Sequence, residues 1–203
     1  MHFISDRSGW WNLYRDEGEG QSATPLFPRH AEFGAPQWVF GQSTYGFAEG
    51  GKVVCAFSEG GAGKLAFIGV DGAASVIQVP FTEIRNLRVR RREILFRGGS
   101  PTEAPAIIRL SLETQKPEKL QRASTAAERE EIRECLTTPR LIEFPTAGGL
   151  TAFAWYYPPH NPHFVAHENE RPPLIVKSHG GPTAQASSTL SLHTQFWTSR
   201  GYA

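Results

Sequence analysis

The sequence predicts a mostly β protein, in which short antiparallel sheets that repeat like propeller blades are followed by a short α/β segment. The 203 residues include 20 Gly and 15 Pro, and Trp, Tyr and Phe together reach 11%. Frequent turns separated by aromatic residues are typical of β structure. Similar apolar strands also recur along the first part of the chain, about one blade length apart.

Three hairpins are predicted before residue 120. Their strands are Phe3–Ser5 with Trp11–Arg15, Lys52–Phe57 with Lys64–Val70, and Glu93–Arg97 with Ala106–Ser111. Leu13 to Leu65 is 52 positions, and Leu65 to Ile108 is 43. These steps bracket the roughly 40–50 residues of a propeller blade. Because a closed propeller needs at least about four blades, further blades are expected upstream.

The pattern changes near residue 124. Thr125-Ala126-Ala127-Glu128 fits a capping box, in which the Thr hydroxyl caps a free N–H and the Glu reaches back. A helix is predicted over 126–136, because Pro139 cannot continue it. Next, Arg140–Phe144 and Leu150–Tyr157 are predicted to form a hairpin across Gly148-Gly149.

The last part of the chain is predicted to contain a strand, a glycine loop and a helix. Leu174–Lys177 is interpreted as a compact buried strand that leads directly into Ser178-His179-Gly180-Gly181-Pro182. A polar, proline-rich surface loop is expected before it, over 160–173. A helix is predicted over about residues 189–200, ending at Gly201 as a C′ glycine.

The strand followed by His-Gly-Gly-Pro is the motif that carries chemistry. Acyl transfer through a tetrahedral intermediate needs N–H donors directed at the developing oxyanion. Glycine lets the backbone turn so that its N–H groups face a pocket, and α/β-hydrolases take one donor from a loop of this type. We predict Gly181 as this donor, with Gly180 as the second choice. His179 is expected to pack beneath the loop, and a plain Gly-Gly-Pro turn is the alternative.

Together the motifs resemble the prolyl oligopeptidase family of serine peptidases, especially its acylaminoacyl-peptidase and dipeptidyl-peptidase-like branch. SDRSGWWNLYR resembles a propeller blade, IEFPTAGGLTAFAWYYPP the hairpin that opens the catalytic domain, PPLIVKSHGGPTAQ the oxyanion strand and loop, and QFWTSRGYA the following helix. The resemblance implies C-terminal blades of a β-propeller and then the first elements of an α/β-hydrolase domain, in a truncated sequence. The implied parts are a partial propeller (1–124), a linker helix (125–138) and the N-terminal part of the peptidase domain (139–203).

The resemblance implies a serine-type exopeptidase that hydrolyses short peptides through an acyl-enzyme. The family's Ser, Asp and His follow the glycine loop in the sequence, and no Gly-x-Ser-x-Gly occurs in the 203 residues. The nearest string, which begins at Gly41, has Tyr45 in place of the second Gly. We therefore assign no triad residue and expect this fragment alone to be inactive. An HGG-type carboxylesterase and a non-catalytic propeller-type interaction protein from a truncated gene remain open.

Composition and charge argue against several other classes. Lys plus Arg number 21 against 20 for Asp plus Glu, so the net charge is +1 and gives no electrostatic case for nucleic acid or a membrane surface. The one basic cluster, Arg88 with Arg90, Arg91 and Arg92, is interpreted as a solvated strand face. Two cysteines make no disulfide framework, and Cys55 is expected to be a buried small hydrophobe. We expect a cytoplasmic protein with a peptide substrate and no cofactor, and leave homo-oligomerisation open.

Three other patterns are weighed and set aside. His160, His163 and His167 with Glu168 have metal-ligand spacing but lie in a loop without partner cysteines, so no metal site is assigned. Ser58–Lys64 resembles a phosphate loop, yet it lacks the opening Gly and the magnesium-binding hydroxyl residue, so a hairpin turn is predicted. Four of the five tryptophans are expected to pack on sheets rather than to form a binding surface; they are Trp10, Trp11, Trp38 and Trp155.

Overall fold

The computed structural model describes residues 1–18, 22–36, 38–181 and 184–203. The chain divides into two compact units. Unit 1 comprises residues 1–98 and 106–121, and unit 2 comprises residues 99–105 and 122–203. Among the helices of the described residues, none is long and apolar enough to cross a membrane.

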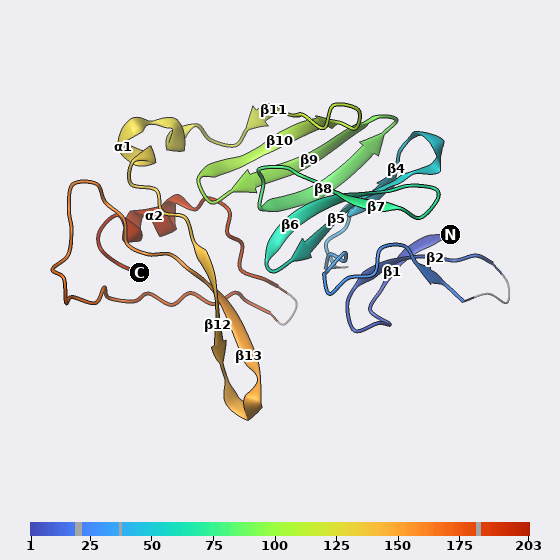
Figure 1. The fold of residues 1–203 in the computed structure, drawn as a ribbon. Coiled ribbons are helices and arrows are strands. Elements are labelled where there is room, and N and C mark those ends of the chain that lie inside the picture. Colours follow the sequence, from blue (N-terminus) through green and yellow to red (C-terminus); the bar gives the residue numbers. More distant parts are fainter. Residues whose placement is uncertain (19–21, 37, 182–183) are drawn as a thin grey trace. The chain divides into compact units, whose positions relative to one another are not determined.

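Antiparallel sheets in sequential order make up the first part of the chain (Figure 1). The first sheet has the order β1-β2-β3, the second β4-β5-β6-β7, and the third β11-β10-β9-β8. Four-stranded sheets whose neighbours follow one another along the chain are typical of propeller blades. The predicted mostly β fold with antiparallel sheets is therefore confirmed. The strands are β1 His2–Ser5, β2 Asn12–Arg15, β3 Thr24–Pro25, β4 Tyr45–Phe47, β5 Val53–Glu59, β6 Ala62–Ile68, β7 Ala74–Ile77, β8 Glu83–Arg90, β9 Glu93–Ser100, β10 Glu103–Ser111 and β11 Pro117–Arg122.

Strand β5 shows how these sheets pack. All five residues from Val53 to Phe57 are buried, although successive side chains of a strand point to opposite faces. Val54 and Ala56 belong to the apolar cluster shared with the β8–β11 sheet. Val53, Cys55 and Phe57 belong to a second cluster that includes Leu13 of the β1–β3 sheet. The central sheet is therefore covered on both faces, as in a stack of blades.

The local turns agree with the sequence-based expectations. The predicted hairpins correspond to β1–β2, β5–β6 and β9–β10, within a few residues at each end. The Ser58–Lys64 segment closes the β5–β6 hairpin, with Gly60 at φ +58° and Gly61 at φ +76°. Left-handed backbone favours glycine because other residues clash there. The prediction of a hairpin turn is confirmed, and so is the burial of Cys55.

The basic cluster is solvated, as expected. The side chains of Arg88, Arg90, Arg91 and Arg92 are all exposed. Arg92 pairs with Glu49 at 2.6 Å and with Glu113 at 2.5 Å, which raises the pKa of its guanidinium, first through the hydrogen bond to Glu49. Carboxylates thus neutralise part of this face.

Unit 2 contains short helical turns, one hairpin and one longer helix. The hairpin pairs Arg140 with Tyr156 and Pro145 with Thr151, as the sequence indicated. Its helices and strands are η2 Ala126–Glu128, α1 Glu130–Arg133, β12 Arg140–Pro145, η3 Ala147–Gly149, β13 Thr151–Tyr156 and α2 Leu192–Thr198, and the short turn η1 Glu49–Gly51 lies in unit 1.

The linker helix differs from the prediction. The helix expected over 126–136 is broken into η2 and α1, because Arg129 between them has extended backbone (φ −67°, ψ 131°). The predicted capping box is wrong: Thr125 caps no N–H through its side chain. Instead, the Ser124 hydroxyl accepts from the Ala126 N–H at 3.1 Å, and Glu128 pairs with Arg122.

Candidate oxyanion loop and its anchors

The two glycines predicted as oxyanion donors lie in an exposed segment of unit 2. Gly181 has φ +73°, in the left-handed region, whereas Gly180 does not. A Cβ at either position would meet no atom within 4 Å. Glycine at position 181 is therefore explained by backbone conformation rather than by close packing. Pro182 and Thr183, which complete the motif, lie outside the described residues.

The segment that leads into the loop differs from its prediction. Leu174–Lys177 is not a regular strand, and its side chains are not buried: Leu174 is 66% and Val176 82% exposed. His179 is also exposed, so the expected packing beneath the loop is wrong. The segment is apolar, but its three apolar side chains remain 45–82% exposed.

Two backbone hydrogen bonds nevertheless give this segment a strand-like pairing. The Ala203 N–H donates to the Pro173 carbonyl at 2.9 Å, and the Ile175 N–H donates to the Ala203 carbonyl at 2.8 Å. In a parallel pair of strands, one residue bonds to the two residues that flank its partner. Here Ala203 bonds to Pro173 and Ile175, which flank Leu174. The chain therefore passes from the strand-like segment through the glycine loop and α2 back to a parallel neighbour, which is a β–loop–α–β connection.

The downstream side of the loop is anchored at two further points. The Trp155 indole Nε1 donates to the Ala186 carbonyl at 3.2 Å, so this tryptophan of β13 holds backbone rather than forming an open aromatic surface. The Leu190 N–H donates to the Ser100 carbonyl at 2.8 Å. Ser100 lies at the end of β9 and is 8% exposed.

Helix α2 (Leu192–Thr198) begins three residues later and ends two residues earlier than the predicted helix. The Ser191 hydroxyl accepts from the Thr194 N–H at 3.3 Å and caps the helix. Gly201, at φ +89°, follows the helix as predicted.

A buried amide joins α2 to the linker. The Gln195 Oε1 atom accepts from the Thr137 N–H at 2.8 Å, and the Gln195 Nε2 group donates to the Thr137 carbonyl at 3.0 Å. Both residues are 5% exposed. Sequence reasoning missed Gln195, because a glutamine at a helical position carries no sign of its distant partner.

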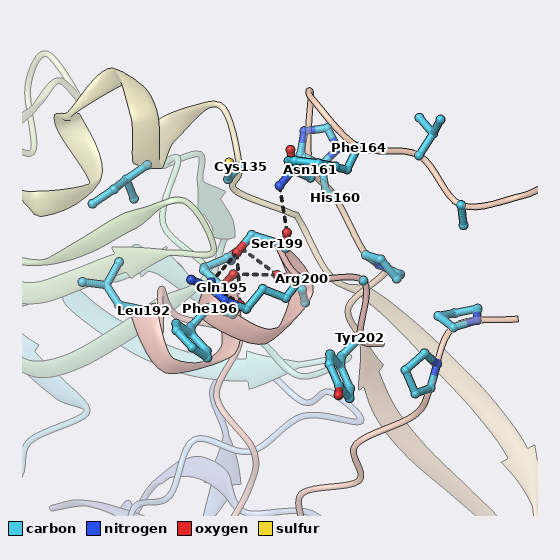
Figure 2. Close-up of a pocket in the computed structure, with 18 of the residues that line it drawn as sticks. Cys135, His160, Asn161, Phe164, Leu192, Gln195, Phe196, Ser199, Arg200 and Tyr202 are labelled. Carbon is cyan, nitrogen blue, oxygen red and sulfur yellow. Dashed lines mark hydrogen bonds between the residues drawn. The ribbon is translucent and has the colours of Figure 1, made fainter.

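A groove of about 1440 Å³ lies beside α2 (Figure 2). His160 Nε2 lies 3.0 Å from the Glu134 carbonyl, and Asn161 Nδ2 donates to the Ser199 carbonyl at 2.9 Å. Burial raises the pKa of Tyr157, which follows the groove-lining Tyr156 in the chain. The searched, described residues include no cluster of three metal-ligating side chains. The His160 and Asn161 side chains of the groove thus hold the backbone segments that line it.

The other tryptophans differ in their surroundings. Trp10 stacks on His30 with ring centroids 5.9 Å apart, and Trp11 lies against Gly34, where a Cβ would approach its ring to 3.2 Å. Trp38 is 65% exposed. The expectation of packing holds for Trp11 and is wrong for Trp38, and Trp10 remains 39% exposed beside its histidine partner.

Solved structures resemble this chain over almost its whole length. A Mycobacterium tuberculosis puromycin-hydrolyzing peptidase matches 99% of the chain with 29% sequence identity and a TM-score of 0.90. The structural neighbours are prolyl oligopeptidase-family serine peptidases. A puromycin hydrolase matches 99% with 28% identity and a TM-score of 0.86.

More distant members share the fold. Porphyromonas gingivalis dipeptidyl peptidase 4 matches 99% of the chain at 14% identity, with a TM-score of 0.71. The chain spans about 30% of the two puromycin-cleaving structures and 28% of the dipeptidyl peptidase. Neither a protein-family model nor a curated protein matches the chain by sequence. The family resemblance predicted from the motifs is thus confirmed at the level of structure.

Proposed function

We propose that the protein containing this chain is a serine-type peptidase that hydrolyses short peptides, as an exopeptidase, through an acyl-enzyme. The observation that carries the proposal is the match of 99% of the chain to a puromycin-hydrolyzing peptidase at a TM-score of 0.90 and 29% identity. The nucleophile, its base and the acid that orients the base are expected in residues beyond these 203. The partial propeller (1–124), linker (125–138) and start of the peptidase domain (139–203) remain the proposed organisation.

In this mechanism the Gly181 N–H is the donor that stabilises the oxyanion. Carbonyl attack by the serine moves negative charge onto the substrate oxygen, and a fixed N–H stabilises that charge more in the transition state than in the ground state. The positive φ of Gly181 supports this role, since such a turn reorients successive N–H groups. Gly180 is the second choice for the donor.

We also propose a reducing, cytoplasmic setting for this peptidase. Both Cys55 and Cys135 are free thiols, and reduced cysteines are typical of that compartment.

The proposal is tested on the complete translation product with blocked acylaminoacyl substrates, dipeptidyl substrates, puromycin and simple esters. Peptide or puromycin hydrolysis, together with labelling by a serine-directed phosphonate, is the expected result. Ester hydrolysis without peptide hydrolysis would identify a carboxylesterase instead. If neither substrate class is cleaved and no serine is labelled, the non-catalytic interaction protein is correct.

The role of Gly181 is tested by Gly181→Ala. Left-handed backbone costs an L-residue about 1–2 kcal/mol, so the loop relaxes and misdirects the N–H. We expect kcat to fall roughly 10–100-fold with little change in KM, less than the roughly 100–1000-fold for complete loss of an oxyanion donor, because the N–H is displaced and not removed. The matched control is Gly148→Ala, because Gly148 has φ +69° and equally open surroundings in the turn between β12 and β13. Equal losses in both variants would remove Gly181 from the mechanism.

A further inference from the structure

The turn between β9 and β10 holds the chain just downstream of the glycine loop. Although these strands continue into unit 1, residues 99–105 belong to unit 2. The Ser100 carbonyl accepts from the Leu190 N–H at 2.8 Å, and the Ser100 hydroxyl accepts from the Glu103 N–H at 3.1 Å. The bond from Glu103 to the Ser100 hydroxyl fixes the turn, and the turn in turn positions the Ser100 carbonyl that accepts from Leu190. The turn between β9 and β10 thus holds residue 190 by a backbone hydrogen bond.

Steric contact reinforces this hydrogen bond. A Cβ on Gly99 would lie 2.7 Å from the Thr189 Cγ2 methyl, closer than real Cβ contacts come, and 3.5 Å from Pro105 Cα. Gly99 does not have a positive φ, so backbone conformation does not require glycine there. Glycine is required instead because Thr189 occupies the space.

Thr189 cannot simply rotate away. Its Oγ1 accepts from the Ser187 Oγ at 2.9 Å, and its N–H donates to the same Ser187 Oγ at 3.1 Å. A β-branched side chain is already restricted at χ1. Rotation of Thr189 therefore breaks a hydrogen bond of the local turn, and a side chain added at position 99 would displace the 187–190 segment as a unit.

We propose that Gly99, Ser100 and Thr189 are positioning residues for the candidate oxyanion loop; this inference rests on the proposed function. Residues 178–181 are exposed, so the packing of their own side chains does not fix them. In the described part of the chain, hydrogen bonds hold the backbone on either side of them, at Ile175 with Ala203 upstream and at Ala186 and Leu190 downstream. A shift of the Leu190 anchor passes along the chain to the Gly181 N–H, and misplacement by about 1 Å can cost up to about 100-fold in rate.

The test uses the complete translation product with Gly99→Ala, Thr189→Ser and the double variant. Thr189→Ser removes the Cγ2 methyl but keeps the hydroxyl that bonds Ser187. Gly99→Ala is expected to lower kcat about tenfold with KM nearly unchanged, and to speed amide exchange in a peptide covering 184–191 about tenfold. Thr189→Ser alone is expected to remain near wild type. The double variant is expected to recover both kcat and exchange protection to within about threefold.

Gly98→Ala is the matched control for a general loss of stability. A Cβ there would meet Phe96, Ile108 and Phe81 of the β8–β11 sheet's apolar cluster at 2.9–3.0 Å. We expect it to lower Tm, and Thr189→Ser should not rescue it. Unchanged exchange at 184–191 in Gly99→Ala, or no rescue by Thr189→Ser, overturns the proposal. An inactive wild type would instead reject the proposed function, and the exchange comparison would still decide whether the turn holds the segment.

Discussion

The two units bury opposite kinds of side chains. The fully buried side chains of unit 1 are nearly all apolar and form two clusters, one on each face of the central sheet. In the described part of unit 2, the buried side chains are polar; they are Ser100, Thr137, Ser188, Gln195 and Thr198. Unit 1 is therefore stabilised mainly by the removal of apolar surface from water, and unit 2 mainly by hydrogen bonds that satisfy backbone groups.

Two similar apolar runs show what this difference means. Val53–Phe57 in unit 1 and Leu174–Val176 in unit 2 both suggest a buried strand from composition alone. The first run is buried throughout, whereas the side chains of the second are 45–82% exposed. The first run pairs with adjacent hairpin partners and is covered by two sheets, whereas the second bonds, among the described residues, to Ala203. Apolar composition indicates that a run is stabilised by burial, but it does not indicate which part of the protein buries it.

The largest expected effect compares a leucine from each unit. Leu65 is fully buried, so Leu65→Ala should cost about 3 kcal/mol of unfolding free energy, from lost burial and the cavity left behind. Leu174, 66% exposed, should cost less than about 0.5 kcal/mol when changed to Ala. Urea unfolding of this chain, followed by circular dichroism, measures both. Similar costs at the two positions would break the comparison.

Gln195→Leu tests whether polar contacts hold unit 2. The substitution keeps the approximate size of the side chain but leaves the buried N–H and carbonyl of Thr137 without partners. We expect a loss of about 2 kcal/mol and faster amide exchange over residues 130–138. Gln195→Glu retains the acceptor for the Thr137 N–H, but it loses the donor to the Thr137 carbonyl and buries a carboxylate against that carbonyl, so it should cost at least as much. A leucine variant as stable as wild type would mean that these hydrogen bonds contribute little.

The smallest effect sharpens the description of the unit 1 core. Burial raises the pKa of the Cys55 thiol from its usual 9.0 to about 12. The unfolded thiol therefore ionises above pH 9 while the folded one stays neutral, so stability falls as pH rises. Between pH 8 and pH 10 this linkage should remove about 1.4 kcal/mol, and Cys55→Ala should lack that part of the decline. Urea unfolding of both proteins at the two pH values measures the difference; parallel declines would show that Cys55 is accessible.

The sequence predicted local elements well and some interactions poorly. The β5–β6 turn followed from its glycines, since the chain can only reverse there at low cost with positive φ. The capping box failed because the Glu128 N–H, which the Thr125 hydroxyl should cap, donates to the Thr125 carbonyl at 2.9 Å instead. The hydroxyl that does accept a local N–H belongs to Ser124, one residue earlier, and its donor is Ala126. Capping by one of two adjacent hydroxyl residues differs in free energy from capping by the other by less than sequence rules can resolve.

For the candidate site, the sequence indicated the glycine loop and not its supports. Gly180 and Gly181 form a recognisable motif, and the solved structures agree with the family that the motif suggests. The anchors Ser100, Trp155 and Gln195 had no such pattern, since their partners lie 90, 31 and 58 positions away. The sequence around Trp155 indicates an aromatic strand residue and gives no sign of the indole hydrogen bond to the Ala186 carbonyl.

The sequence by itself determined the hairpins, the positive-φ turns and the family resemblance, because these depend on residues a few positions apart and on their intrinsic backbone preferences. Only the tertiary structure decided which apolar residues are covered and which groups fix the glycine loop. Burial of both faces of β5 requires two separate sheets, and the hydrogen bond that holds the Leu190 N–H requires the distant Ser100 carbonyl. These contacts depend on where the folded chain brings remote segments together, which local composition does not specify.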